Sequence, residues 1–284
     1  MVGSSLACLG SIALAAACAL PASAATEYKN VSVRFAASAK DPKLTGYTST
    51  VVLDDAGRTF TVRTESPVRR TIATPYADIV KAIVEVAADT KTPERHYWFY
   101  FERKPGAFPD RFWLELGENG ADLLAKTRPL LGDRLQVLDF PLAQEMSNLS
   151  SLTDLAVNYS VHVERPGPPL PVPTKDRVLI VVVCPAVEGA RKQPITLDAN
   201  GRVVAVNEPG TYSFVNLDPG EYTLVSQAEN ARWFKVKLEA GQVYYFFQDT
   251  LEGGERTGLS MHSKEMALLE MAGASYSDWR RVKY

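Results

Sequence analysis

The feature that most constrains the fold is the proline-rich segment between Arg165 and Thr174, which reads Arg-Pro-Gly-Pro-Pro-Leu-Pro-Val-Pro-Thr. Its five prolines lack the backbone N–H groups that a helix or a central strand requires. The segment therefore predicts a semi-rigid, extended linker over residues 165–176. We expect an N-terminal domain over residues 25–164 and a β-sandwich domain over residues 177–284, each with its own hydrophobic interior.

The half that precedes the linker shows both strand and helix patterns. Alternation of apolar and polar residues, apolar runs and turn residues predict strands over 30–36, 47–53, 58–63, 97–101, 112–116, 135–140 and 155–163. Thr74 and Pro75 are typical of a helix start, and the apolar residues after them recur at helical spacing: Tyr76, Ile79, Val80, Ile83 and Val84. With a second helix expected near 119–131, the N-terminal domain is predicted to be α+β.

The half that follows the linker is more uniform. Seven short strands are expected, over 178–183, 195–197, 202–206, 210–215, 221–226, 233–238 and 243–248. Turns with residues that tolerate positive φ separate several of them, as in Asp198–Gly201 and Asp218–Gly220. This spacing is typical of an antiparallel β-sandwich. Ser263 is expected to cap a short terminal helix that continues to Met271.

The C-terminal half also resembles a known family. The stretches that carry the likeness are Pro194–Ala205, Pro209–Tyr212, Leu217–Leu224, Leu238–Tyr245 and the terminal helix. Together they resemble the domain-of-unknown-function family numbered 2846, whose members are bacterial envelope domains, and they are also similar to PEGA-type and transthyretin-like sandwich modules. The resemblance implies a transthyretin-like fold and an envelope location, and it implies no catalytic residues.

The first 24 residues are typical of a signal peptide. They contain no charged side chain, and the apolar run from Ile12 to Leu20 is too short to span a bilayer. Ala22-Ser23-Ala24 favours cleavage after Ala24, whereas Leu14–Cys18 resembles a lipobox and would make Cys18 a lipidated N-terminus. Both routes predict an exported protein, in the periplasm or anchored to the outer membrane, with a lipid on Cys18 as its only expected membrane contact.

Charge and cysteine content argue against a nucleic-acid partner and against a reactive thiol. The 31 basic and 33 acidic side chains give a net charge of −2 without a long basic run, so no nucleic acid is expected as a partner. Cys184 is the only cysteine beyond the export segment, and it lies in an apolar strand, which predicts a buried and unreactive thiol.

No sequence motif indicates a catalytic centre. His96, His162 and His262 lie far apart and in no zinc-ligand spacing, and no nucleophile elbow or phosphate-binding loop is present. We therefore expect no metal, no cofactor and no enzymatic activity. A hydrolase stays as an alternative, to be tested by whether a histidine lies within hydrogen-bonding distance of a serine and a carboxylate.

Aromatic residues give the remaining functional hypothesis. The strands His96–Phe101 and Tyr244–Phe247 are aromatic on both faces, which favours burial on both sides. If they are instead exposed in a groove, Trp98, Trp113 and Trp233 are the candidate ligand-binding residues. The sequence thus predicts a non-catalytic exported binding or scaffold module for an unknown envelope protein, with a glycan- or peptidoglycan-binding protein as the alternative.

Overall fold

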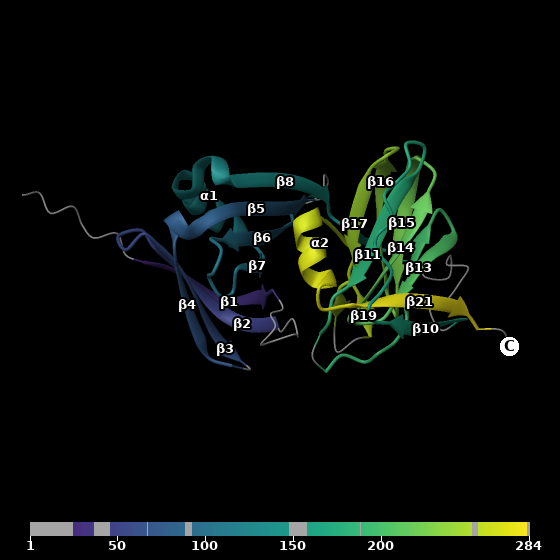
Figure 1. Ribbon diagram of the computed structural model, residues 1–284, viewed down its shortest axis with the longest axis horizontal. Helices are drawn as coiled ribbons and strands as arrows, with labels where there is room; N and C mark the ends of the chain where they lie inside the picture. The colour runs from purple at the N-terminus through teal and green to yellow at the C-terminus, as the bar shows by residue number, and fades with distance from the viewer. Residues whose placement is uncertain are drawn as a thin grey trace, which may run out of the picture.

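The computed structural model describes residues 25–36, 46–66, 68–88, 93–147, 158–187, 189–251 and 255–282. The predicted signal peptide and Cys18 lie outside these residues. The protein is β-rich, and Figure 1 shows a curled sheet on one side, two facing sheets on the other, and a helix between them. No helix in the described ranges is long and apolar enough to cross a membrane.

The eight-stranded sheet is built from the N-terminal half, in the order β4-β3-β2-β1-β7-β6-β5-β8. Its strands are β1 (Thr26–Phe35), β2 (Gly46–Asp54), β3 (Thr59–Ser66), β4 (Arg70–Pro75), β5 (Ile79–Ala88), β6 (Arg95–Arg103), β7 (Arg111–Leu116) and β8 (Leu135–Pro141). The helix α1 (Gly120–Leu131) follows β7, and two 3₁₀ turns, η1 (Tyr76–Asp78) and η2 (Gly132–Arg134), precede β5 and β8.

The other two sheets face each other in the C-terminal half. The six-stranded sheet contains β10 (Tyr159–Glu164), β21 (Ser275–Arg281), β14 (Thr211–Leu217), β11 (Val178–Cys184), β17 (Val243–Phe247) and β20 (Ser260–His262), in that order. The five-stranded sheet contains β13 (Arg202–Asn207), β12 (Ile195–Ala199), β15 (Gly220–Gln227), β16 (Ala231–Leu238) and β9 (Gln144–Glu145). A small ribbon of β18 (Thr250–Leu251) and β19 (Arg256–Thr257) and the helix α2 (Lys264–Met271) complete the fold.

All seven strands expected after the linker are confirmed, as are both the helix at Asn119–Leu131 and the terminal helix. Ser263 caps α2 as predicted, because its side chain accepts a hydrogen bond from the backbone N–H of Met266 at 3.4 Å. The hairpin turn between β2 and β3 is also confirmed, with the Gly57 N–H donating to Asp54 Oδ1 at 2.8 Å.

The helix predicted after Thr74 is wrong. Thr74 and Pro75 end β4, η1 makes a single turn, and residues 79–88 form β5. Every residue from Ala82 to Ala87 is buried, because β5 lies between β6 and β8 and is covered on both faces. In such a strand apolar residues need not alternate, and their spacing then fits a helix equally well.

The expectation of separate interiors on either side of the linker is also wrong. β10 precedes the prolines, yet it pairs along its whole length with β21 of the six-stranded sheet. β9 likewise joins β16 of the five-stranded sheet. One hydrophobic cluster includes Trp98 and Trp113 of the first half together with Val181 and Phe247 of the second. The prolines interrupt pairing only where they stand, so chain that lies before them remains free to pair with the sheets beyond them.

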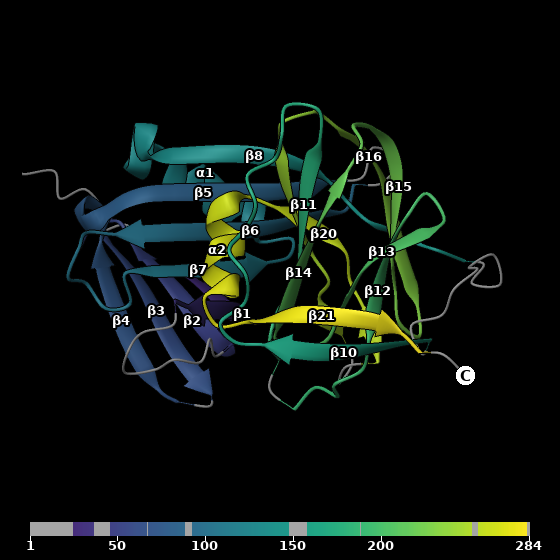
Figure 2. The same cartoon turned by 45° about the vertical axis from the view of Figure 1, so that its right-hand side comes forward.

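The expectation that the second half is purely antiparallel needs a further correction. β11 pairs in parallel with β17, and β14 pairs in parallel with β21, so the six-stranded sheet is mixed. Alternate residues of β11 point to its two sides: Val178, Ile180 and Val182 pack against the five-stranded sheet, whereas Leu179, Val181 and Val183 pack toward α2 and the eight-stranded sheet. Figure 2 shows α2 in this middle position. The two halves therefore meet through a third hydrophobic core.

Candidate functional site

A pocket of about 260 Å³ lies at the junction between the two halves of the chain. Its walls come from β1, β6 and β7 of the eight-stranded sheet and from the segments that follow β11 and β17 in the second half. The polar groups that matter most for its chemistry are Arg34, Glu115, Asp249 and Ser260. We refer to it below as the junction pocket.

A chain of buried polar groups runs from the interior to the wall of this pocket. Glu85 lies on β5 with 0% of its surface exposed, and its carboxylate Oε2 is 2.5 Å from Nδ1 of His262. The other ring nitrogen of His262, Nε2, lies 2.8 Å from Oγ of Ser260, which lines the pocket. Glu85 Oε1 also accepts a hydrogen bond from the backbone N–H of Ser263 at 2.9 Å. A carboxylate, an imidazole and a hydroxyl are thus joined in sequence.

The surroundings of His262 favour its charged form. Burial opposes the imidazolium, but the carboxylates of Glu85, Asp249 and Glu115 outweigh that effect and raise the pKa of His262 above its ordinary value. The ring is enclosed by Phe247 at 4.1 Å and by Trp98, in a T-shaped arrangement, at 4.9 Å between ring centroids. The three carboxylates therefore stabilise the imidazolium form of a histidine that burial alone would keep neutral.

The hydroxyl proton of Ser260 has two acceptors within reach. Oγ lies 3.1 Å from Oδ2 of Asp249 and 2.8 Å from Nε2 of His262. When His262 carries both ring protons it donates to Ser260, and Ser260 then donates to Asp249. When Nε2 of His262 is unprotonated, it can accept the serine proton instead. The protonation state of His262 therefore decides where the serine proton points.

Glu115 adds a second carboxylate to the same pocket. Its side chain is exposed to the pocket, while surrounding protein and the charge of Asp249 raise the pKa of its carboxyl group. No residue in the described part of the chain forms a hydrogen bond or an ion pair with its side-chain carboxylate. Glu115 and Asp249 come from the two halves of the chain, so the pocket exists only when these halves are joined.

The three tryptophans predicted as ligand-binding residues lie in two places. Trp98 and Trp113 are both buried and line the junction pocket, whereas Trp233 is half-buried on β16 and is not among the pocket residues. Trp98 stacks on His96 with ring centroids 6.0 Å apart. The Arg34 guanidinium lies over Trp113 at 5.5 Å from its ring centroid. The ring faces that would stack on a sugar are therefore partly occupied by protein.

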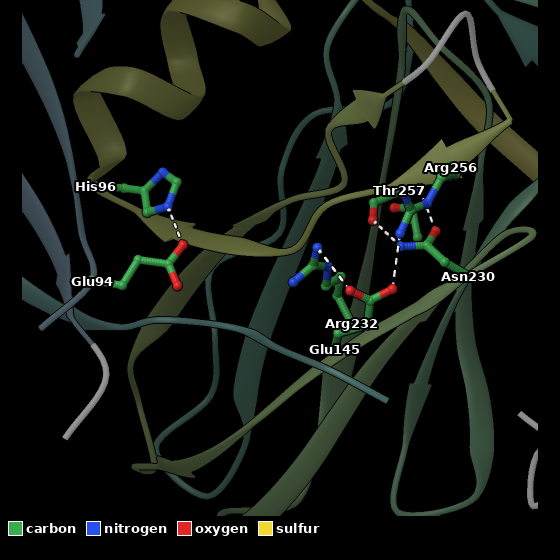
Figure 3. A network of polar contacts seen from close by, with 7 residues as sticks. All are labelled: Glu94, His96, Glu145, Asn230, Arg232, Arg256 and Thr257. Carbon is green, nitrogen blue, oxygen red and sulfur yellow. Dashed lines mark hydrogen bonds and ion pairs between the residues drawn. The ribbon is translucent and has the colours of Figure 1, made fainter. Parts of the chain in front are cut away.

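Charged pairs line the rim, and Figure 3 shows two groups of them. Glu145 of β9 accepts a hydrogen bond from Arg256 at 2.8 Å and forms an ion pair with Arg232 at 3.4 Å. Glu94 lies 3.0 Å from Nε2 of His96. Because Arg232, Glu94 and His96 also line the pocket, its mouth offers charges of both signs.

The remaining predicted residues lie away from this chemistry. His162 is exposed on β10. Cys184 is buried as predicted, and burial raises the pKa of its thiol to about 12. In the described ranges no three histidine, cysteine or acidic side chains gather closely enough to hold a metal ion.

The sequence reasoning missed Glu85, Asp249 and Ser260. Two sequence signals pointed to Glu85 and Ser260. Glu85 is the one acidic residue in the apolar stretch Ala82–Ala88, and Ser260 and His262 are two residues apart, which places both side chains on one face of a strand. Neither signal indicates which strand supplies the third group, because Glu85 lies 177 residues from His262 in the chain.

Comparison with known proteins gives little further guidance. No family model matches the chain, and no curated protein matches it. Among solved structures it is similar to a putative cell adhesion protein from Bacteroides fragilis, with 8% identity over 84% of each chain and a TM-score of 0.18. A likeness at this level carries no argument about function.

Proposed function

We propose that the chain is an exported bacterial envelope protein, in the periplasm or at the outer membrane, which binds a cell-wall glycan in the junction pocket. The observation that carries this proposal is the meeting of Glu115 and Asp249 from the two halves of the chain in one pocket. An unpaired carboxylate at a pocket wall is available to accept hydrogen bonds from a ligand.

The chemistry of the pocket favours hydrogen bonding over stacking. Glu115 and Asp249 suit hydroxyl and ammonium donors, and Arg34 and Arg232 suit carboxylates. The ring faces of Trp98 and Trp113 are partly taken by His96 and Arg34. Peptidoglycan, which presents hydroxyl, amine and carboxylate groups along one polymer, matches this mixture.

The finer architecture forms part of the same proposal. We assign the eight-stranded sheet and α1 to an α+β domain, and the two facing sheets, which include β9 and β10, to a transthyretin-like sandwich of the envelope type, in line with the resemblance of residues 178–275. The sandwich then acts as a scaffold that presents Asp249 and Ser260 to the eight-stranded sheet.

Retention on purified peptidoglycan sacculi tests the proposal. The wild-type protein should be retained, and Glu115→Gln should weaken retention about tenfold, as expected for the loss of a charge-assisted hydrogen bond. Glu221→Gln is the matched control, since Glu221 is an exposed carboxylate on β15 outside the junction pocket. Failure of the wild type to be retained, or equal retention of Glu115→Gln and wild type, would contradict glycan binding at this site.

A further inference from the structure

The buried relay has the order of groups found in enzymes with a nucleophilic serine. Ser260 Oγ meets Nε2 of His262 at 2.8 Å, and Nδ1 of the same ring meets the Glu85 carboxylate at 2.5 Å. Glu85 thereby fixes the tautomer in which Nδ1 carries a proton and Nε2 faces the serine. The hydroxyl lies at the wall of the junction pocket, where a bound molecule can reach it.

We propose that Ser260 is a nucleophile that attacks an ester or amide carbonyl bound in the junction pocket, with His262 as general base and Glu85 as the residue that positions His262. This activity goes beyond binding, departs from the expectation of a non-catalytic protein, and needs only the pocket rather than a glycan in it. The geometry is the one expected of a hydrolase, because His262 lies within hydrogen-bonding distance of both a serine and a carboxylate.

The reaction balances without a cofactor. As Oγ forms its bond to the carbonyl carbon, the serine proton moves to Nε2 of His262 and the carbonyl π electrons move to oxygen. When the bond to the leaving group breaks, that group takes the proton from Nε2. Water then attacks the acyl-serine, His262 accepts the water proton, and the proton returns to Oγ as the carboxylic acid leaves. Arg34 and Arg232 supply the positive charge of the pocket.

Asp249 makes this nucleophile dependent on pH. Three carboxylates face His262: Glu85 from β5, Glu115 from β7 and Asp249 from the segment after β17. Together they favour the imidazolium, which is no base, and in that state the Ser260 proton goes to Asp249. Reactivity should therefore rise as the pH increases through the pKa of His262 in the folded protein, on the alkaline side of its ordinary value.

Labelling with a biotinylated alkyl fluorophosphonate tests the proposal, because such a probe phosphonylates activated serines and releases fluoride. Peptide mapping of the labelled wild type should place the adduct on Ser260, and the rate should rise with pH. Ser260→Ala should abolish labelling. Ser277→Ala should leave it unchanged, since Ser277 is buried but donates to the Val206 carbonyl, away from the pocket.

Two further variants separate a reactive site from a structural one. Glu85→Gln should slow labelling about 100-fold, the scale of general-base assistance, while circular dichroism shows that the chain remains folded. Asp249→Asn should shift the pH profile of labelling toward lower pH, because one of the charges that hold the proton on His262 is gone. A purely structural network would produce neither effect.

The outcomes also separate the two proposals. No adduct on Ser260 between pH 6 and 10, or the same adduct in Ser260→Ala, would overturn the nucleophile and leave glycan binding untouched. A Ser260 adduct in a protein that sacculi do not retain would overturn glycan binding and leave the nucleophile in place.

Discussion

The two helices of this protein lie on opposite faces of the eight-stranded sheet, and different interactions hold them there. α1 covers the inner face through Leu123 and Leu131, which join a cluster of aliphatic and aromatic side chains. α2 covers the outer face through Met266, Ala267 and Leu269, but charged groups accompany this apolar contact. The polar contacts of α1 with the sheet, from Tyr28 to Asp122 and from Lys126 to Thr26, are only partly buried, whereas those of Glu270 and of the Ser263 N–H beside α2 are buried. The junction between distant segments adds directional contacts, which specify one arrangement.

Several polar contacts around α2 cross between the halves. Glu85 of β5 accepts from the Ser263 N–H at the start of the helix. Glu270, near its end, accepts from Trp113 Nε1 at 2.8 Å and pairs with Arg34 at 3.2 Å. Lys81 and Glu265 form an ion pair at 2.6 Å between them. Both ends of α2 and its outer side are thus joined to the eight-stranded sheet.

The largest loss of stability is expected in the hydrophobic cluster between α1 and the eight-stranded sheet. Phe99 on β6 is fully buried there, so Phe99→Ala should lower the free energy of unfolding by about 4 kcal/mol through lost burial and the cavity that remains. Denaturant titration at pH 6 and pH 9 should give the same loss, because no charge is involved. Val80→Ala, at an exposed position, should cost no more than about 0.5 kcal/mol. If the loss in Phe99→Ala depended markedly on pH, the contrast between the apolar cluster under α1 and the charged junction under α2 would be wrong.

At the junction the loss should instead depend on pH. Glu85→Gln removes the carboxylate that pairs with buried His262, and breaking a buried pair of this kind should cost about 3 kcal/mol at pH 6.

The sign of that pH dependence follows from the raised pKa of His262. The folded state binds its proton more tightly than the unfolded state, so the contribution to stability is complete below about 6.5, the unfolded value, and is lost as the pH rises through the folded pKa. Wild type and Glu85→Gln should therefore converge in stability toward alkaline pH. A difference that stays constant between pH 6 and 9 would mean that His262 does not titrate in the folded protein across this range.

A smaller effect is expected where α1 begins. A Cβ added to Gly120 would lie 2.3 Å from the Tyr97 side chain, so Gly120→Ala should cost about 2 kcal/mol through overpacking. Gly117→Ala is the control, because nothing lies within 4 Å of a Cβ at that position. Thermal unfolding of the two variants gives the comparison, and equal midpoints would show that α1 has room to move away from the sheet.

The smallest effect is expected for the half-exposed pair of α2. Lys81→Ala removes the partner of Glu265, and solvent screens this pair, so the loss should be at most about 1 kcal/mol and should shrink further in 0.5 M salt. Chemical denaturation at low and high salt measures it. A loss comparable to that of Glu85→Gln would indicate that the outer side of α2, and not its buried start, controls the junction.

Local chemistry was predictable wherever a segment carried its own signals. The turn at Asp54–Gly57, the Ser263 cap and the seven strands after the linker depend on neighbouring residues, and all are present. β5 was not predictable, because a strand buried on both faces loses the alternation by which strands are recognised. The candidate site could not be found for a related reason: Glu85, Asp249 and Ser260 are ordinary residues until β5, β20 and the segment between β17 and β18 bring them together.

The sequence by itself determined a β-rich chain with helices near 119–131 and 264–271 and a buried Cys184, because propensity, turn chemistry and hydrophobic pattern act over a few residues. Only the tertiary structure decided that β10 joins β21 across the prolines, that α2 lies between the halves, and that His262 connects Glu85 to Ser260. The physical reason is that the hydrophobic effect is non-directional, so that burial stabilises an apolar face whichever other apolar face covers it. Which faces meet depends on the packing of the whole chain, and the positions of the buried charges follow from it.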